Sequence, residues 1–162
     1  MEIGSFEEIA EQFNELVGRV VWCTFTTTDR KGRPRSRILH PIWEGSTGWI
    51  ATGRHSLKEK HLATNPYVSV TYFDLPADDA LGQKQIYAEC TTEWEDDEDE
   101  KRRLWDLFKT TPAPLGYDPA LFFQSVDNPE FGMLKLIPWR VELSAIGDMM
   151  TGEEPRIWRQ DV

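Results

Sequence analysis

The sequence predicts a mainly β protein of the α+β class, a small antiparallel barrel with a few peripheral helices. Three observations support this prediction: five or six segments are rich in β-branched and aromatic residues, short turn-forming stretches join most of them, and few segments show helical periodicity. Strands joined by short connections pair antiparallel, and closure into a barrel removes the open edges of a small sheet. The 162 residues are expected to form one domain spanning 1–162.

The first half of the chain is expected to begin with a helix from Ser5 to about Val17, because a capping box opens it and apolar residues recur on one face. The next strands are bounded by turn-forming residues and are expected at 20–28, 35–43 and 48–52. The second and third of these form a hairpin across the turn EGST. Pro41 indicates an edge or a bulge in the second strand.

A short helix is expected over 56–64, ending before Pro66, because the residue that precedes a proline disfavours helical geometry. The remaining strands are expected at 67–74, 84–94 and 133–147. The segment LPADDALG, at 75–82, is expected to be a loop. The run EWEDDEDE holds seven acids and precedes KRRLWDLFKTT, which indicates a solvated helix whose charges match its macrodipole.

The segment TPAPLGYDPALFFQSVDNPEFG, at 111–132, is too apolar for a linker and is expected to lie on the barrel or beside a pocket. Its aromatic residues are candidates for that pocket, although packing in the core is the alternative for most of them. The candidates are Tyr117, Phe122, Phe123, Phe131 and, from the last strand, Trp139. The polar tail has only Ile157 and Trp158 as apolar anchors.

Composition and charge exclude several classes of function. The formal net charge of −10 disfavours nucleic acid and anionic lipid as partners, and no apolar run reaches membrane-spanning length. The acidic, amphipathic N-terminus is neither a signal nor a transit peptide. Cys23 and Cys90 lie in strand segments and are expected to be buried free thiols, which fits the cytoplasm. Glycine-rich nucleotide loops, a nucleophile elbow and metal-binding histidine spacing are all missing from the sequence, so no metal site is expected.

The most informative segment is WIATGRHSLKEK, where a strand ends and a helix begins. Where the strand ends it brings together the hydroxyl and basic residues Thr52, Arg54, His55, Ser56 and Lys58. Free N–H groups at a helix start, together with hydroxyls and cations, suit a phosphate. The alternative is that Ser56 serves only as the N-cap of a capping box with Glu59.

Four segments, in this order and spacing, resemble the flavin-binding split-barrel superfamily typified by pyridoxamine 5′-phosphate oxidase, and its general stress protein branch. They are RSRILHPIW, IATGRHSLKEKHLATNP, YVSVTYFD and KQIYAECTTEW, and the later LKLIPWRVEL resembles the closing strand of that family. The resemblance implies a six-stranded antiparallel split barrel. It also implies a homodimer with flavin mononucleotide (FMN) bound at the subunit interface.

The resemblance implies a phosphate site built by matching residues. Arg37 lies where a strand arginine of the family contacts the flavin phosphate, and Ser56 and Lys58 match the phosphate-binding loop and helix start. Thr52 matches a hydroxyl or backbone contact at the end of the intervening strand. Arg37 and Lys58 are expected to lie outside the core. The alternative for Arg37 is an arginine on the solvent face of its strand.

The resemblance also implies contacts with the flavin ring. Backbone groups of Ile38, Leu39 and His40 would line the ring, as in the family. Gln85 matches a glutamine that reaches the flavin from the other subunit, with an ordinary strand end as the alternative.

The sequence departs from the oxidase at the substrate. The Tyr, Arg and Ser set that grips the phosphate of pyridoxamine 5′-phosphate has no counterpart, and Ile42 and Leu57 replace basic residues of the family. We therefore expect an FMN-binding oxidoreductase that acts on another small substrate, with no catalytic residue assigned. The alternatives are a deazaflavin-dependent reductase and a non-catalytic flavin- or haem-binding stress protein.

Overall fold

The structure is a computed structural model that describes residues 1–75, 78–79 and 81–160, without the side chain of Met149. The helices are α1 (Glu7–Val20), α2 (Leu57–Leu62), α3 (Glu98–Thr110), α4 (Ala120–Phe123) and α5 (Asp148–Thr151). The strands are β1 (Glu2–Ile3), β2 (Cys23–Thr28), β3 (Pro34–Leu39), β4 (Ile42–Glu44), β5 (Thr47–Gly53), β6 (Tyr67–Phe73), β7 (Lys84–Glu95), β8 (Phe131–Ala145) and β9 (Arg156–Arg159). The loop expected at 75–82 lies partly outside the described residues.

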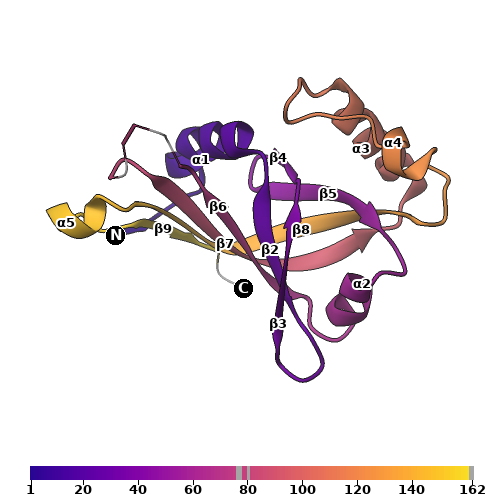
Figure 1. Ribbon diagram of the computed structural model, residues 1–162, viewed down its shortest axis with the longest axis horizontal. Coiled ribbons are helices and arrows are strands. Elements are labelled where there is room, and N and C mark those ends of the chain that lie inside the picture. The colour runs from indigo at the N-terminus through magenta and orange to yellow at the C-terminus, as the bar shows by residue number, and fades with distance from the viewer. Residues whose placement is uncertain (76–77, 80, 161–162) are drawn as a thin grey trace.

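The strands form a barrel, as the sequence predicts (Figure 1). Antiparallel pairing runs from β3 through β2, β6, β7 and β8 to β5, and β5 also pairs with β4. β3 and β4 follow one another along the chain, so the segment that carries both of them completes the ring. The expected antiparallel barrel of six strands is therefore confirmed, with β3 and β4 together counting as one barrel strand.

Pro41 splits the strand that was expected at 35–43. β3 pairs with β2, whereas β4 pairs with β5, with Ile42 opposite Trp49. Only the second half therefore forms the hairpin that the turn EGST predicts. Pro41 lacks a backbone N–H and cannot donate to a ladder, which explains why pairing stops there.

The helix caps agree in part with the sequence. Ser56 caps α2 as expected, accepting a hydrogen bond from the Glu59 N–H at 3.4 Å. The predicted cap of α1 is wrong, because Phe6 is the N-cap and its side chain makes no capping bond. The Glu8 carboxylate instead accepts from the Ser5 N–H at 3.0 Å, which is the other half of a capping box. α1 also extends to Val20.

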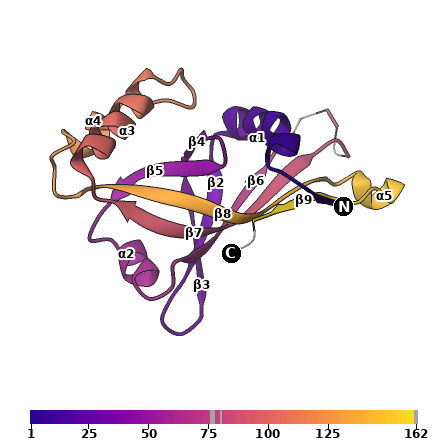
Figure 2. The same cartoon turned by 180° about the vertical axis from the view of Figure 1, so that it is seen from behind.

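The C-terminal tail contributes structure that the sequence analysis missed. β9 pairs antiparallel with the second half of β8 and parallel with β1, which extends the barrel sheet to nine strands. Trp158 on β9 is buried against Phe6, the N-cap of α1. Figure 2 shows β9, α5 and the N-terminus together at one end of the molecule, and α3 and α4 at the other. The tail looked polar because only alternate residues of a short strand face the core.

Two apolar clusters hold the molecule together. The larger fills the barrel beneath α1, and the smaller packs α3 against β5 and β8 through Leu104, Trp105 and Phe108. Cys23 and Cys90 are buried free thiols, as expected, and burial raises the pKa of Cys23 to about 12. Within the described ranges, no helix has the length and apolar character needed to cross a membrane.

Candidate functional site

A cavity of about 570 Å³ lies where the barrel strands part between β3 and β5. β4 pairs with β5 only from Thr47 to Trp49, so in the described chain the remainder of β5 has a strand partner, β8, on one edge only. Among the described strands, β3 likewise pairs only with β2. The volume falls in the range of ordinary ligand pockets. The cavity is lined by Trp22, Ile38, Leu39, His40, Ile50, Ala51, Thr52, Gly53, Pro114, Tyr117, Leu121, Phe122 and Phe123.

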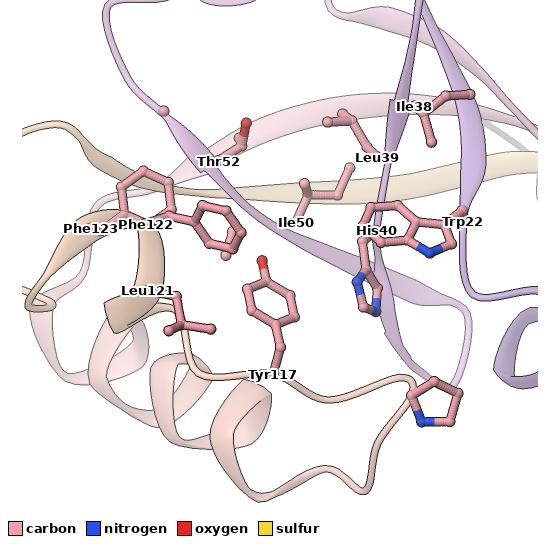
Figure 3. Close-up of a pocket in the computed structure, with 13 residues that line it drawn as sticks. Trp22, Ile38, Leu39, His40, Ile50, Thr52, Tyr117, Leu121, Phe122 and Phe123 are labelled. Atoms are coloured by element: carbon pink, nitrogen blue, oxygen red, sulfur yellow. The ribbon is translucent and has the colours of Figure 1, made fainter.

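The cavity has an apolar cover opposite the two strand edges (Figure 3). The cover comes from the segment around α4, whose residues Tyr117, Leu121, Phe122 and Phe123 face the strands. Of the five aromatic residues considered for a pocket, three therefore line it. Phe131 instead lies in the core beneath α3, and Trp139 lies on another part of the sheet.

His40 lies on the cavity wall between two aromatic rings. Its ring centroid is 4.8 Å from that of Trp22 and 5.1 Å from that of Tyr117. Burial lowers the pKa of His40, and a hydrogen bond with the Leu115 backbone opposes that effect only in part. Nε2 is buried and has no hydrogen-bond partner within the described residues. His40 is therefore a neutral ring with one polar atom left unsatisfied.

Lys58 is buried near the cavity, with only 5% of the residue exposed, so the expectation that it lies outside the core is wrong. Its Nζ lies 3.1 Å from Ser56 Oγ and 3.5 Å from the carbonyl oxygen of Gly53, which lines the cavity. Burial, followed by repulsion from Arg37, lowers the pKa of Lys58 to about 8, and attraction to Glu59 opposes this shift only in part. Among the described residues, no carboxylate forms an ion pair with it.

Arg37 is the second cation of the site. Its Nη1 donates to Thr27 Oγ1 at 3.0 Å, and Thr27 Oγ1 lies 2.9 Å from His61 Nδ1. Thr27 and His61 are both buried, so this chain of polar groups holds the guanidinium in place beside Phe25. Burial lowers the pKa of Arg37, although an arginine remains charged. Like Lys58, it has no acidic partner in the part of the chain that the structure describes.

Thr27 and His61 were not among the site residues expected from the sequence. His61 follows Lys58 by three residues, and that spacing places two helical residues on one face. Thr27 follows Phe25 by two residues on β2, so both face the inside of the barrel. These spacings could have indicated the pair, but only the fold brings β2, β3 and α2 together.

Arg54 and His55, the other two basic residues considered at the strand end, both lie beside acidic side chains. Arg54 pairs with Glu59 at 3.0 Å and with Asp96 at 3.1 Å, and its guanidinium lies 4.4 Å from the Trp94 ring centre. His55 lies 3.7 Å from Glu59. α2 has only six residues, so its dipole adds little to anion binding. Lys58 and Arg37, which lie close enough to repel each other, are the cations available for an anion.

The structure brings together seven of the eight residues expected to bind a cofactor, and it separates Gln85 from them. Gln85 Nε2 donates to Ser144 Oγ at 3.0 Å, and its Oε1 accepts from the Tyr87 hydroxyl at 3.0 Å. It lines a different pocket, of about 300 Å³, with residues of α1 and the C-terminal segment. In the described ranges there is also no cluster of His, Cys, Asp or Glu that could hold a metal ion.

The antiparallel barrel that opens between β3 and β5 defines a split-barrel protein. The chain belongs to the pyridoxamine 5′-phosphate oxidase family, whose sequence pattern matches residues 9–144. This confirms the resemblance found in the sequence. A search of the curated proteins gave no match.

Solved structures show the same fold. A protein related to general stress protein 26 from Clostridium acetobutylicum is 16% identical, with a TM-score of 0.69, over 94% of this chain and 95% of that one. A haem-binding protein from Mycobacterium smegmatis is 17% identical, with a TM-score of 0.67, over 88% of this chain and 55% of that one. A haem storage protein from Vibrio cholerae is 14% identical, with a TM-score of 0.59, over 80% and 89%. At these identities the likeness concerns the fold alone.

Proposed function

We propose that this protein binds FMN in the opening between β3 and β5 and acts as an oxidoreductase on a small organic substrate. One observation carries the proposal: beside an apolar cavity, Lys58 is a buried cation and Arg37 a partly buried one, and neither forms an ion pair with a carboxylate in the described residues. Desolvated charges are normally paired, so an anionic ligand that completes this site would be strongly held. FMN combines such an anion, its phosphate, with a planar ring suited to the cavity.

The residues have distinct roles in this proposal. Lys58, Arg37 and the Ser56 hydroxyl would hold the phosphate, while Thr27 and His61 position Arg37. Edge backbone groups of Ile38, Leu39 and His40, together with Thr52, would bind and orient the ring. FMN itself supplies the transfer of electrons or hydride. The aromatic cover would restrict the access of water to the reacting face.

The substrate is proposed to be other than pyridoxamine 5′-phosphate. A second phosphate would need its own cations, and none of the cavity-lining residues is lysine or arginine. Residues 96–125 instead form α3, α4 and the apolar cover. Among the lining residues, no acid or base has a partner that would mark it as a catalytic group, so the proposal names no catalytic residue.

A haem-binding function is the second candidate, and His40 favours it. Its neutral ring lies on the cavity wall with Nε2 free of protein hydrogen bonds in the described residues, and neutral imidazole nitrogen is a common haem ligand. The names of two structural neighbours describe haem binding and haem storage.

An absorption spectrum of the protein, purified without added cofactor, tests these candidates. The visible bands of a flavin would support the proposal, a deazaflavin spectrum would change the cofactor, and an intense haem band abolished by His40→Ala would favour the second candidate. The turnover of the flavin-loaded protein with a reduced nicotinamide as electron donor should then be measured. Turnover would indicate an oxidoreductase, and its absence would indicate a stress protein that only binds the flavin.

We also propose that the protein is a homodimer, because Gln85 can reach a flavin only in another copy of the chain. The cavity mouth supports a second copy, since Trp22 and Ile38 line the cavity and are 57% and 61% exposed. The interface should be large and apolar, as in obligate dimers. Sedimentation at micromolar concentration should give a dimer. A stable monomer that still binds FMN would rule out a Gln85 contact from a second subunit.

A cytoplasmic location is proposed as well, because the two buried cysteines are free thiols, as is usual in a reducing compartment.

FMN affinity should fall as pH rises above about 8. Lys58 has a pKa of about 8 in the free protein, and a bound phosphate favours the ammonium and raises that pKa. At a pH between the pKa of Lys58 in the free protein and its pKa in the complex, FMN binding takes up a proton. The dissociation constant of FMN should therefore rise by up to about tenfold per pH unit in that range. Stability without ligand has the opposite pH dependence. The pKa of Lys58 is lower in the folded protein than in the unfolded chain, so the unfolded chain binds more protons from about pH 8 to about pH 10.5. The free energy of unfolding of the unliganded protein therefore rises with pH over this range.

Titration of FMN fluorescence from about pH 7 to about pH 9.5 measures this dependence. Lys58→Met is the matched control, because its curve should be flat over the range where the wild-type affinity falls. A wild-type affinity that stays constant across this interval would mean that Lys58 does not contact the phosphate.

A further inference from the structure

The two sides of the cavity differ in chemistry. On one side lie the edges of β3 and β5, with their backbone groups. On the other lies the cover, whose side chains are aromatic or aliphatic, namely Pro114, Tyr117, Leu121, Phe122 and Phe123. Lysine, arginine, aspartate and glutamate are all missing from the lining residues. A charged group placed against the cover would lose its hydration, and no lysine, arginine, aspartate or glutamate lines the cavity to compensate.

Tyr117 is the polar group of the cover. Its ring is fixed by three neighbours, with centroid distances of 5.1 Å to His40, 5.4 Å to Phe108 and 5.9 Å to Phe122. Its hydroxyl points toward the space between α4 and β5, and it makes no hydrogen bond to any described residue. Burial raises the pKa of Tyr117 to about 12, so the hydroxyl keeps its proton at neutral pH.

We propose that the cover is a subsite for an uncharged, planar aromatic compound that carries a carbonyl or nitro oxygen, and that Tyr117 donates a hydrogen bond to that oxygen. This inference rests on the proposed function, because the subsite adjoins the strand edges assigned to the flavin. It specifies the class of the small substrate.

Burial and geometry support this class of ligand. Phe122 lines the cavity and is 70% exposed, so a planar ring laid against it would remove a large apolar surface from water. A ligand oxygen at the Tyr117 hydroxyl would supply the hydrogen-bond partner that this group lacks among the described residues. An aliphatic compound would use one of these features at most, and a charged compound would lose its hydration against the apolar cover.

Isothermal titration with 2-methyl-1,4-naphthoquinone tests the subsite, both without flavin and with FMN bound. Tyr117→Phe removes only the hydroxyl and should weaken quinone binding about three- to tenfold, the effect of one neutral hydrogen bond. Tyr67→Phe, at an exposed tyrosine on β6 away from the cavity, is the matched control and should bind like wild type. With FMN bound, so that its phosphate occupies the Lys58 and Arg37 site, the anionic analogue 1,4-naphthoquinone-2-sulfonate should bind wild type at least about tenfold more weakly than the neutral quinone.

The outcomes separate this inference from the proposed function. Quinone binding that depends on Tyr117, in a protein that does not bind FMN, would contradict the proposed function and support the subsite. The inference is overturned if, with FMN bound, the sulfonate binds as tightly as the neutral quinone, if Tyr117→Phe has no effect, or if the quinone does not bind, even where FMN does.

Discussion

Lys58→Met should weaken FMN binding by about tenfold to a hundredfold, and Arg37→Met should do the same. A hydrogen bond between a charged group and a phosphate contributes about 1.5–3 kcal/mol, and each 1.4 kcal/mol corresponds to about tenfold in affinity. Methionine keeps the unbranched apolar stem, so Lys58→Met leaves the packing beside Trp94 largely filled. The unliganded variant should be at least as stable as wild type, because a desolvated ammonium without an acidic partner in the described chain has been removed.

This prediction has two controls, a substitution at an exposed lysine of α2 and a flavin without a phosphate. Lys60→Met makes the same change at an exposed position of α2, and FMN affinity should not change. Riboflavin lacks the phosphate, so it should bind wild type more weakly than FMN does. Its affinity should fall little further in Lys58→Met or Arg37→Met. Fluorescence titration of both flavins measures all of these constants. If Lys58→Met and Arg37→Met bind FMN as tightly as wild type, the phosphate site lies elsewhere and Ser56 is only a cap.

Phe13→Ala should destabilise the protein by about 3–5 kcal/mol, the usual result of truncating a fully buried phenylalanine. Phe13 is 0% exposed on α1, and its ring centre lies 4.9 Å from that of Trp43 on β4. Trp43 in turn donates a hydrogen bond to the Tyr72 hydroxyl at 3.0 Å. The side chain of Phe13 therefore packs α1 against the barrel beside the strand that completes the ring.

Urea unfolding followed by circular dichroism measures this loss, with Asn14→Ala as the control at an exposed position of the same helix. The control should change stability by less than about 0.5 kcal/mol. A loss below about 1 kcal/mol for Phe13→Ala would mean that α1 contributes little to the barrel core, contrary to the packing described here.

The local features of the chain could be predicted because they depend on neighbours in the sequence. Alternation of β-branched residues indicated the strands, and the Ser56 capping box indicated the start of α2. Pro41 indicated an edge or a bulge within one strand, where the structure instead has two strands, β3 and β4. The motif around Lys58 also indicated an anion site. The tail was misjudged, because β9 becomes a strand only when β8 and β1 offer edges to pair with.

The sequence by itself determined the antiparallel barrel, the family and the residue types of the candidate phosphate site. Tertiary structure alone decided which cations are available for an anion: Arg54 is paired with Glu59 and Asp96, whereas Lys58 is buried without such a partner in the described residues. It also placed the Tyr117 segment across from β3 and moved Gln85 away from the cavity. The physical reason is that burial and pairing of charges depend on contacts between segments far apart in the chain, which local spacing does not contain.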